Sequence, residues 1–139
     1  MNPHFQRHLR IRFSHCDPAG IVFYPQYLVL FNDLVEDWVT EALGLPYAQL
    51  LLERRVGLPT VNLQCDFKAI CRMGDEVSLG LRVAHVGRSS LRLLLDCRRG
   101  EQVCVTASKT LVTTHLDTHR SVALPDDLRA ALPNTLATA

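Results

Sequence analysis

One carboxylate and a predicted helix start lie close together near the beginning of the chain. Asp17 opens the sequence Asp-Pro-Ala-Gly at residues 17–20, which has the residue preferences of a tight turn. Pro25 suits the first turn of a helix, where a missing N–H costs nothing. A carboxylate beside the free N–H groups of a helix start is suited to hydrolysis, because these groups can stabilise a developing negative oxygen. The alternative is an ordinary loop in which Asp17 only caps the turn.

Two neighbours of Asp17 offer a different chemistry. Cys16 could act as a nucleophile with His15 as its base, but adjacent side chains usually point apart and would not form a hydrogen-bonded pair. The six histidines are scattered, and their spacing matches no set of metal ligands. We therefore favour Asp17 as the reactive group and expect no metal.

A strand and a long helix must position this turn. Apolar residues alternate with arginines before it, which predicts a strand at about 8–14 and a loop at 15–24. Apolar residues then recur at helical spacing, which predicts a helix over about 25–43 that ends at Gly44.

The apolar period changes after a second short helix, predicted at about 46–54. Four segments then alternate as strands do, at about 61–67, 77–83, 91–97 and 102–115. In the last of these, Lys109 falls where an apolar residue is due, which predicts a bulge near 108–111. A short helix follows from Pro125 to about Leu132.

This order of elements predicts an α+β fold in which a five-stranded antiparallel sheet wraps around one long helix. The length favours a single domain over residues 1–139, and we expect loose termini at 1–7 and 133–139.

The run CDPAGIVFYP at residues 16–25, followed by Tyr27 and an acidic, apolar helix, resembles the signature of the 4-hydroxybenzoyl-CoA thioesterase family of hotdog-fold proteins. The resemblance is strong over residues 9–45, and the later strands and Leu124-Pro125 are compatible with it. It implies an acyl-CoA thioesterase that releases coenzyme A and the free acid from an aromatic, 4-hydroxybenzoyl-CoA-like substrate. The alternatives are a broad-specificity short-chain acyl-CoA thioesterase and a non-catalytic acyl-CoA-binding module.

The resemblance also implies catalytic roles. Asp17 aligns with the family's catalytic aspartate, and either it attacks the carbonyl carbon or it activates water. The N–H of Tyr24 is the implied oxyanion donor, with Gln26 and Tyr27 next in the first helical turn, since Pro25 has no N–H.

Other residues are expected to hold the substrate. Some hydrolases of this family place a helix carboxylate against the ring hydroxyl, and the position that aligns here is Asn32, whose amide can still bind a hydroxyl. Substrate contacts are expected at His15, Gly20, Tyr27, Asn32 and Thr60. Phosphate contacts to coenzyme A, on loops near a subunit boundary, are expected at Arg72, Arg88, Ser89 and Ser90.

Composition restricts the partners and the compartment. The net charge of +1 implies no bulk attraction to nucleic acid, and no apolar run is long enough for membrane insertion. Five cysteines without a Cys-x-x-Cys motif or a signal peptide indicate reduced thiols in the cytoplasm. We expect no cofactor, because coenzyme A is part of the substrate, and a homodimer or dimer of dimers, because pairing covers an exposed sheet edge.

Overall fold

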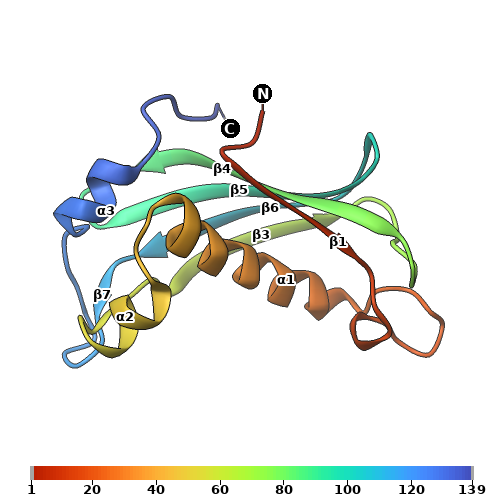
Figure 1. The fold of residues 1–139 in the computed structure, drawn as a ribbon, viewed down its shortest axis with the longest axis horizontal. Helices are drawn as coiled ribbons and strands as arrows, with labels where there is room; N and C mark the ends of the chain where they lie inside the picture. The colour runs from red at the N-terminus through yellow and green to blue at the C-terminus, as the bar shows by residue number, and fades with distance from the viewer. Residues whose placement is uncertain (1, 139) are drawn as a thin grey trace.

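The computed structural model describes residues 2–138 and shows a curved sheet wrapped around one long helix (Figure 1). The five strands are all antiparallel to their neighbours. In spatial order they are β1 (Phe5–Arg10), β4 (Glu76–Val86), β5 (Ser90–Arg99), β6 (Gln102–Val112) and β3 (Thr60–Phe67). The predicted α+β hotdog architecture is confirmed.

Helix α1 (Tyr24–Asp37) fills the concave side of the sheet because one of its faces is apolar. Leu30, Phe31 and Leu34 on that face are each no more than 6% exposed. The helix continues in a wider π-helical turn, η2 (Trp38–Ala42), which adds the buried Trp38 to the same core. The predicted helix over 25–43 is thus one α-helix followed by this turn.

Smaller elements close the end of the sheet away from the start of α1 (Figure 1). They are the helices α2 (Tyr47–Leu52) and α3 (Asp126–Ala131) and the short strands β2 (Val56–Gly57), β7 (Thr114–His115) and β8 (Arg120–Ser121), which form a small second sheet. Among the described residues, none of the helices has the length and apolarity to span a membrane.

The predicted bulge at 108–111 in β6 is wrong. β6 pairs continuously with β5 from Val105 to Val112, and the extra residues lie elsewhere, at Cys104 in β6 and at Val61 in β3. Lys109 therefore stays in phase with its apolar neighbours and points inward, with only 6% of its surface exposed. A charged residue is tolerated there because its Nζ donates a hydrogen bond to Oδ1 of Asn32 on α1.

The expectation of loose termini is wrong for residues 4–7, where the N–H of His4 donates to the carbonyl of Leu81 and β1 begins at Phe5, whereas residues 133–138 form no helix or strand. The first strand covers Phe5–Arg10 rather than 8–14, and a 3₁₀ turn, η1 (Phe13–His15), follows it. At the other end, the N–H of Ala137 donates to the carbonyl of Val83 over 2.8 Å. Met1 and Ala139 lie outside the described residues.

The N-terminal strand was predicted with the wrong bounds because its inward side carries a charge. Arg7 lies between the inward-facing Phe5 and Leu9, where the period predicts an apolar residue. Its guanidinium forms ion pairs with Asp37 and Glu41 at the end of the long helix, which sequence spacing does not reveal.

We expect Leu34→Ala to lower the free energy of unfolding by about 2–5 kcal/mol, because it leaves a cavity between α1 and the sheet. The matched control is Leu52→Ala, at a side chain that is 72% exposed, and should change it by less than about 0.5 kcal/mol. Urea unfolding followed by circular dichroism measures both. Equal losses in the two variants would contradict the proposed role of α1 in the core.

Candidate active site

The Asp17 side chain is fixed by the turn that it opens. Its Oδ1 accepts a hydrogen bond from the N–H of Ala19 over 2.9 Å, and its carbonyl accepts one from the N–H of Gly20 over 2.9 Å. Gly20 has a φ of +77°, which favours glycine. Within residues 2–138, Oδ2 of Asp17 makes no hydrogen bond, so one carboxylate oxygen remains available for chemistry.

Backbone hydrogen bonds hold this turn on both sides. The N–H of Asp17 donates to the carbonyl of Ile21 over 3.0 Å, which closes the turn on itself. The carbonyl of Gly20 accepts from Met73, and the N–H of Val22 donates to Cys71, each over 3.0 Å. The segment 71–73 that leads into β4 therefore anchors the turn, so the carboxylate is placed by a rigid frame.

The helix start lies directly after this frame. Tyr24 is the first residue of α1, so its N–H has no acceptor within the helix. The N–H of Gln26 donates to the carbonyl of Phe23 over 2.8 Å and is already used, and Pro25 has none. Within the described part of the chain, the N–H of Tyr24, unlike that of Gln26, is thus free of an acceptor at the start of the helix.

The surroundings of Cys16 and His15 disfavour a thiol mechanism. Burial, and then the negative charge of Asp17, raise the pKa of the Cys16 thiol, which opposes formation of the thiolate. Nδ1 of His15 accepts a hydrogen bond from the N–H of Arg12 over 2.9 Å and stabilises η1. Cys16 therefore lacks the environment of an activated nucleophile, and the ring nitrogen Nδ1 of His15 is already used in a hydrogen bond to the backbone.

An apolar cavity of about 360 Å³ lies beside the helix start. It is lined by Val22, Tyr24, Tyr27, Phe67, Lys68, Ala69 and Ile70. The Tyr24 ring meets the edge of Phe67 with centroids 6.0 Å apart. Tyr27 is 4% exposed, and its hydroxyl accepts a hydrogen bond from the N–H of Cys71, so it also ties α1 to the anchoring segment. These rings suit a flat or apolar acyl group.

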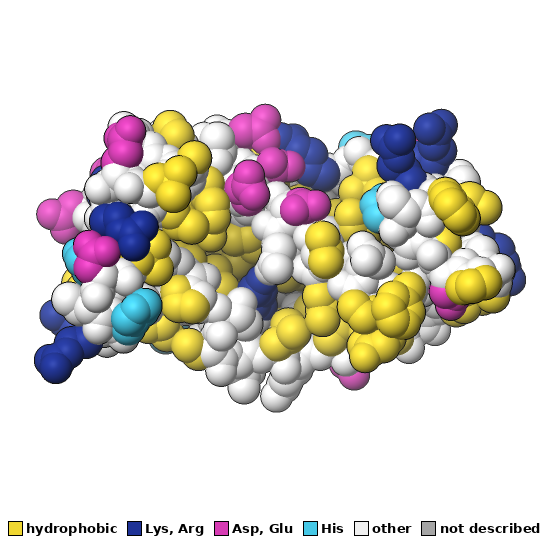
Figure 2. All heavy atoms as spheres, turned by 90° about the horizontal axis from the view of Figure 1, so that it is seen from below, with side chains coloured by type: hydrophobic (Ala, Val, Ile, Leu, Met, Phe, Trp, Pro, Cys, Tyr) yellow, Lys and Arg dark blue, Asp and Glu magenta, His cyan; other side chains and the backbone are white. Residues whose placement is uncertain are grey.

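A second cavity of about 360 Å³ lies further along α1 and contains Asn32 and Thr60. Asn32 follows Tyr24 by eight residues, so it lies roughly 12 Å further along the helix axis. Figure 2 shows a hollow on this face, with basic side-chain atoms recessed in it and acidic side chains along one side. Of the expected substrate residues, Tyr27 lines the first cavity, and Asn32 and Thr60 line the second. His15 lies in a separate hollow beside Leu9 and Leu30, and Gly20 lines neither of the first two cavities.

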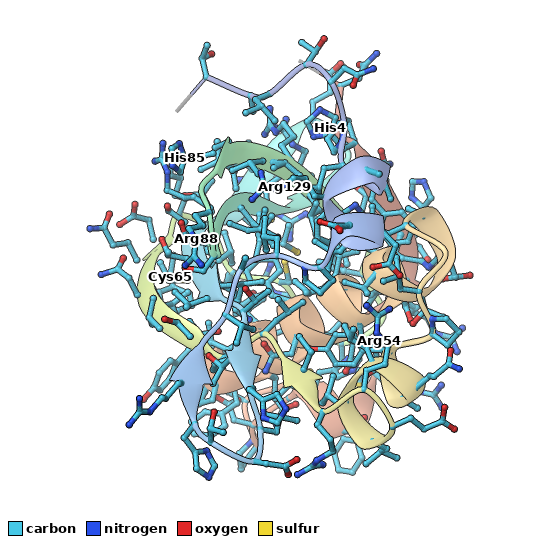
Figure 3. All side chains as sticks on the ribbon, turned by 90° about the vertical axis from the view of Figure 1, so that its left-hand side faces the viewer. His4, Arg54, Cys65, His85, Arg88 and Arg129 are labelled. Atoms are coloured by element: carbon cyan, nitrogen blue, oxygen red, sulfur yellow. The ribbon has the colours of Figure 1, made fainter. Side chains whose placement is uncertain are left out.

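The expected phosphate-binding residues lie at the two opposite ends of β4. Arg72 pairs with Ile21 beside the Asp17 turn. The turn of Arg88, Ser89 and Ser90 lies at the opposite end of β4, roughly 30 Å away, where Figure 3 shows Arg88 in the same region as His85 and Arg129. The structure does not bring Arg72 and Arg88 together within one chain.

Two parts of the site were missed from the sequence. The anchoring segment 71–73 acts through backbone groups, which leave no signal in the residue types. Lys109 did leave a signal, a basic residue at an apolar strand position, but the pattern was interpreted as a bulge.

Comparisons with known proteins identify the family of the chain. The model of the thioesterase-like superfamily matches residues 11–132. A 1,4-dihydroxy-2-naphthoyl-CoA hydrolase of Synechococcus elongatus is 27% identical over 120 residues, covering 86% of this chain and 88% of that protein. A 4-hydroxybenzoyl-CoA thioesterase of a Pseudomonas species is 29% identical over 82 residues, or 58% of each chain.

A solved structure extends the likeness to the whole fold. A gentisyl-coenzyme A thioesterase is 26% identical and superposes with a TM-score of 0.82 over 92% of this chain and 99% of that one. The predicted family and the predicted enzyme class are therefore confirmed. The chain belongs to the thioesterase-like superfamily and is a thioester hydrolase of the hotdog fold.

Proposed function

We propose that this protein hydrolyses aromatic acyl-CoA thioesters, with Asp17 as the catalytic carboxylate and the N–H of Tyr24 as the oxyanion donor. The observation that carries the proposal is the fixed turn, which leaves one Asp17 oxygen free directly before a helix start with an unused N–H. The relatives named above act on aromatic acyl-CoA molecules, which supports the same class here.

The reaction needs negative charge to be stabilised on the thioester carbonyl oxygen. In the proposed pose that oxygen accepts a hydrogen bond from Tyr24, and one such donor contributes about 3 kcal/mol in the transition state. The positive end of the α1 dipole adds to this effect within the first turn. In one route Asp17 attacks the carbonyl carbon, the C–S bond breaks to release the coenzyme A thiolate, and water then hydrolyses the resulting anhydride to the free acid. In the other route Asp17 takes a proton from a water that attacks the carbonyl carbon, and the C–S bond breaks to give the free acid and the coenzyme A thiolate, which is then protonated.

We propose that the active unit is a dimer formed through β3. This strand is one edge of the sheet, and its side chains Val61, Leu63 and Phe67 are 59%, 41% and 51% exposed. An exposed apolar edge strand can pair with a strand of another chain through its free N–H and C=O groups. Two-fold pairing of identical edges is antiparallel, so the Phe67 end of one strand would meet the Thr60 end of the other.

This pairing would bring residues from the two ends of β3 together, one set from each copy. Phe67 contacts the Tyr24 ring at the helix start, whereas Thr60 lines the second cavity. Arg88 also lies at the Thr60 end of the sheet, since Ser90 pairs with Val112 and Thr60 pairs with Leu111. Arg72 from one copy and the Arg88 turn from the other would then flank one substrate.

We expect Asp17→Asn to lower kcat by at least about a hundredfold, because an amide cannot act as base or nucleophile. Release of free thiol from benzoyl, 4-hydroxybenzoyl, phenylacetyl and short aliphatic CoA esters measures the effect and ranks the acyl groups. A folded variant with wild-type turnover would eliminate the role of Asp17. Preference for short aliphatic esters would favour the broad-specificity alternative, and acyl-CoA binding without thiol release would favour the non-catalytic one.

We expect Arg72→Gln and Arg88→Gln each to raise KM by roughly threefold to tenfold with little change in kcat, because contacts to remote phosphates act equally before and during the reaction. The control Arg120→Gln removes an exposed charge from β8 and should leave both constants unchanged. A large fall in kcat without a change in KM would contradict a phosphate-binding role.

We expect the wild-type protein to have a solution mass of two or four times 15.6 kDa, and Leu63→Lys to shift it towards the monomer, since it removes apolar contact area and adds like charges at the edge. Light scattering after gel filtration measures both. Leu52→Lys on α2 is the control and should leave the mass unchanged. An unshifted Leu63→Lys would argue against pairing through β3.

A further inference from the structure

Lys109 is a buried cation that faces a cavity. It lies in the middle of β6, its side chain is 6% exposed, and it lines the second cavity together with Asn32 and Thr60. Its ammonium group has three donors, and the hydrogen bond to Oδ1 of Asn32 accounts for one of them. Within residues 2–138, Lys109 forms no ion pair with a carboxylate, so its other donors are directed to no protein anion.

Burial of the Lys109 ammonium lowers the stability of the folded chain. Burial lowers the pKa of Lys109, because the charged form loses hydration that one amide oxygen does not replace. An apolar residue at this position would continue the row of Val105, Ala107 and Leu111 without that cost. A buried charge kept beside an open cavity is typical of a site that binds a polar ligand group.

The charges around the cavity select the kind of group. Asp33 and Glu36 on α1 also line it, and both are exposed, while Tyr47 contributes a phenol whose pKa is raised by burial and then by Glu36. An ionised carboxylate would be repelled by the two acidic residues on its way to the ammonium. A hydroxyl group can accept a hydrogen bond from the Lys109 ammonium and donate one to a nearby carboxylate, so it is compatible with both kinds of charge in the cavity.

We infer that Lys109 is a specificity-determining residue that binds a hydroxyl group on the ring of the acyl group, with Asn32 as the residue that positions the ammonium. This inference rests on the proposed thioesterase function and on the proposed dimer. The cavity is too far from Tyr24 of its own chain for a single benzoyl ring. Antiparallel pairing of β3 places the cavity of one copy beside the helix start of the other, so Lys109 serves the catalytic loop of the second copy.

The first test compares Lys109→Met with Arg92→Met, which removes a positive charge from the outer face of the neighbouring strand β5. The substrates are benzoyl-CoA, 4-hydroxybenzoyl-CoA and 4-carboxybenzoyl-CoA. We expect the wild type to prefer the hydroxylated ring. Lys109→Met should lower kcat/KM for that ring by about tenfold to a hundredfold and leave benzoyl-CoA unchanged or faster. Arg92→Met should keep the wild-type order.

The outcomes separate the two proposals. If Lys109→Met keeps the preference for the hydroxylated ring, or if the wild type prefers the carboxylated one, the inference is overturned while the thioesterase function stands. If the wild type hydrolyses no ester, the proposed function fails. Calorimetric binding of the neutral compounds 4-hydroxybenzamide and benzamide to the wild type and to Lys109→Met then tests the cavity alone, and equal affinities would overturn the inference.

The second test asks which copy Lys109 serves. Asp17→Asn and Lys109→Met chains are unfolded, mixed in equal amounts and refolded together. A site that combines two chains is restored once in each mixed dimer, so activity on 4-hydroxybenzoyl-CoA should reach roughly one quarter of the wild-type value. Activity no higher than the mean of the two separate variants would show that Lys109 does not act across the dimer.

Discussion

The structure depends on the contact between the start of α1 and the segment that leads into β4. The hydrogen bonds of Gly20 and Val22 to residues 71–73 fix the Asp17 turn, and the Tyr27 hydroxyl fixes the first turn of the helix to the same segment. The core packs the rest of α1 against the sheet and prevents it from sliding. A carboxylate and a helix N–H are thus held by one frame, so the proposed reaction would need little reorganisation when charge develops.

One charged residue, Lys109, is buried on the side of the sheet that packs against α1. The concave face of the sheet is apolar along β4 and β5, but β6 presents Lys109 to the helix. The ammonium of Lys109 donates a hydrogen bond to Oδ1 of Asn32, so each of these two polar side chains has a partner in the other. Positions where a protein keeps a charge in an apolar row are places where binding has competed with stability.

The free edge of β3 connects these two features. Its backbone groups and apolar side chains are unpaired on one side, and its two ends lie next to different cavities. In one chain the helix start and the Lys109 cavity are separated by about two turns of α1. Pairing by a two-fold axis reverses one strand against the other, so one interface would both protect the edge and complete two sites.

The sequence by itself determined the local elements and the turn that carries Asp17. Apolar spacing defined the long helix and the alternating strands, and Asp-Pro-Ala-Gly defined the turn at Asp17, because these features depend on residues close in the chain. Only the tertiary structure decided which distant groups meet. The N-terminal strand pairs with β4, and its inward Arg7 forms an ion pair with Asp37 of α1. Backbone groups at 71–73 hold the Asp17 turn, and the inward Lys109 donates a hydrogen bond to Asn32 of another element. A periodic pattern predicts which positions face the core. It does not predict which residue will pair with a charged side chain at such a position, because that partner comes from another segment and is brought there by tertiary packing.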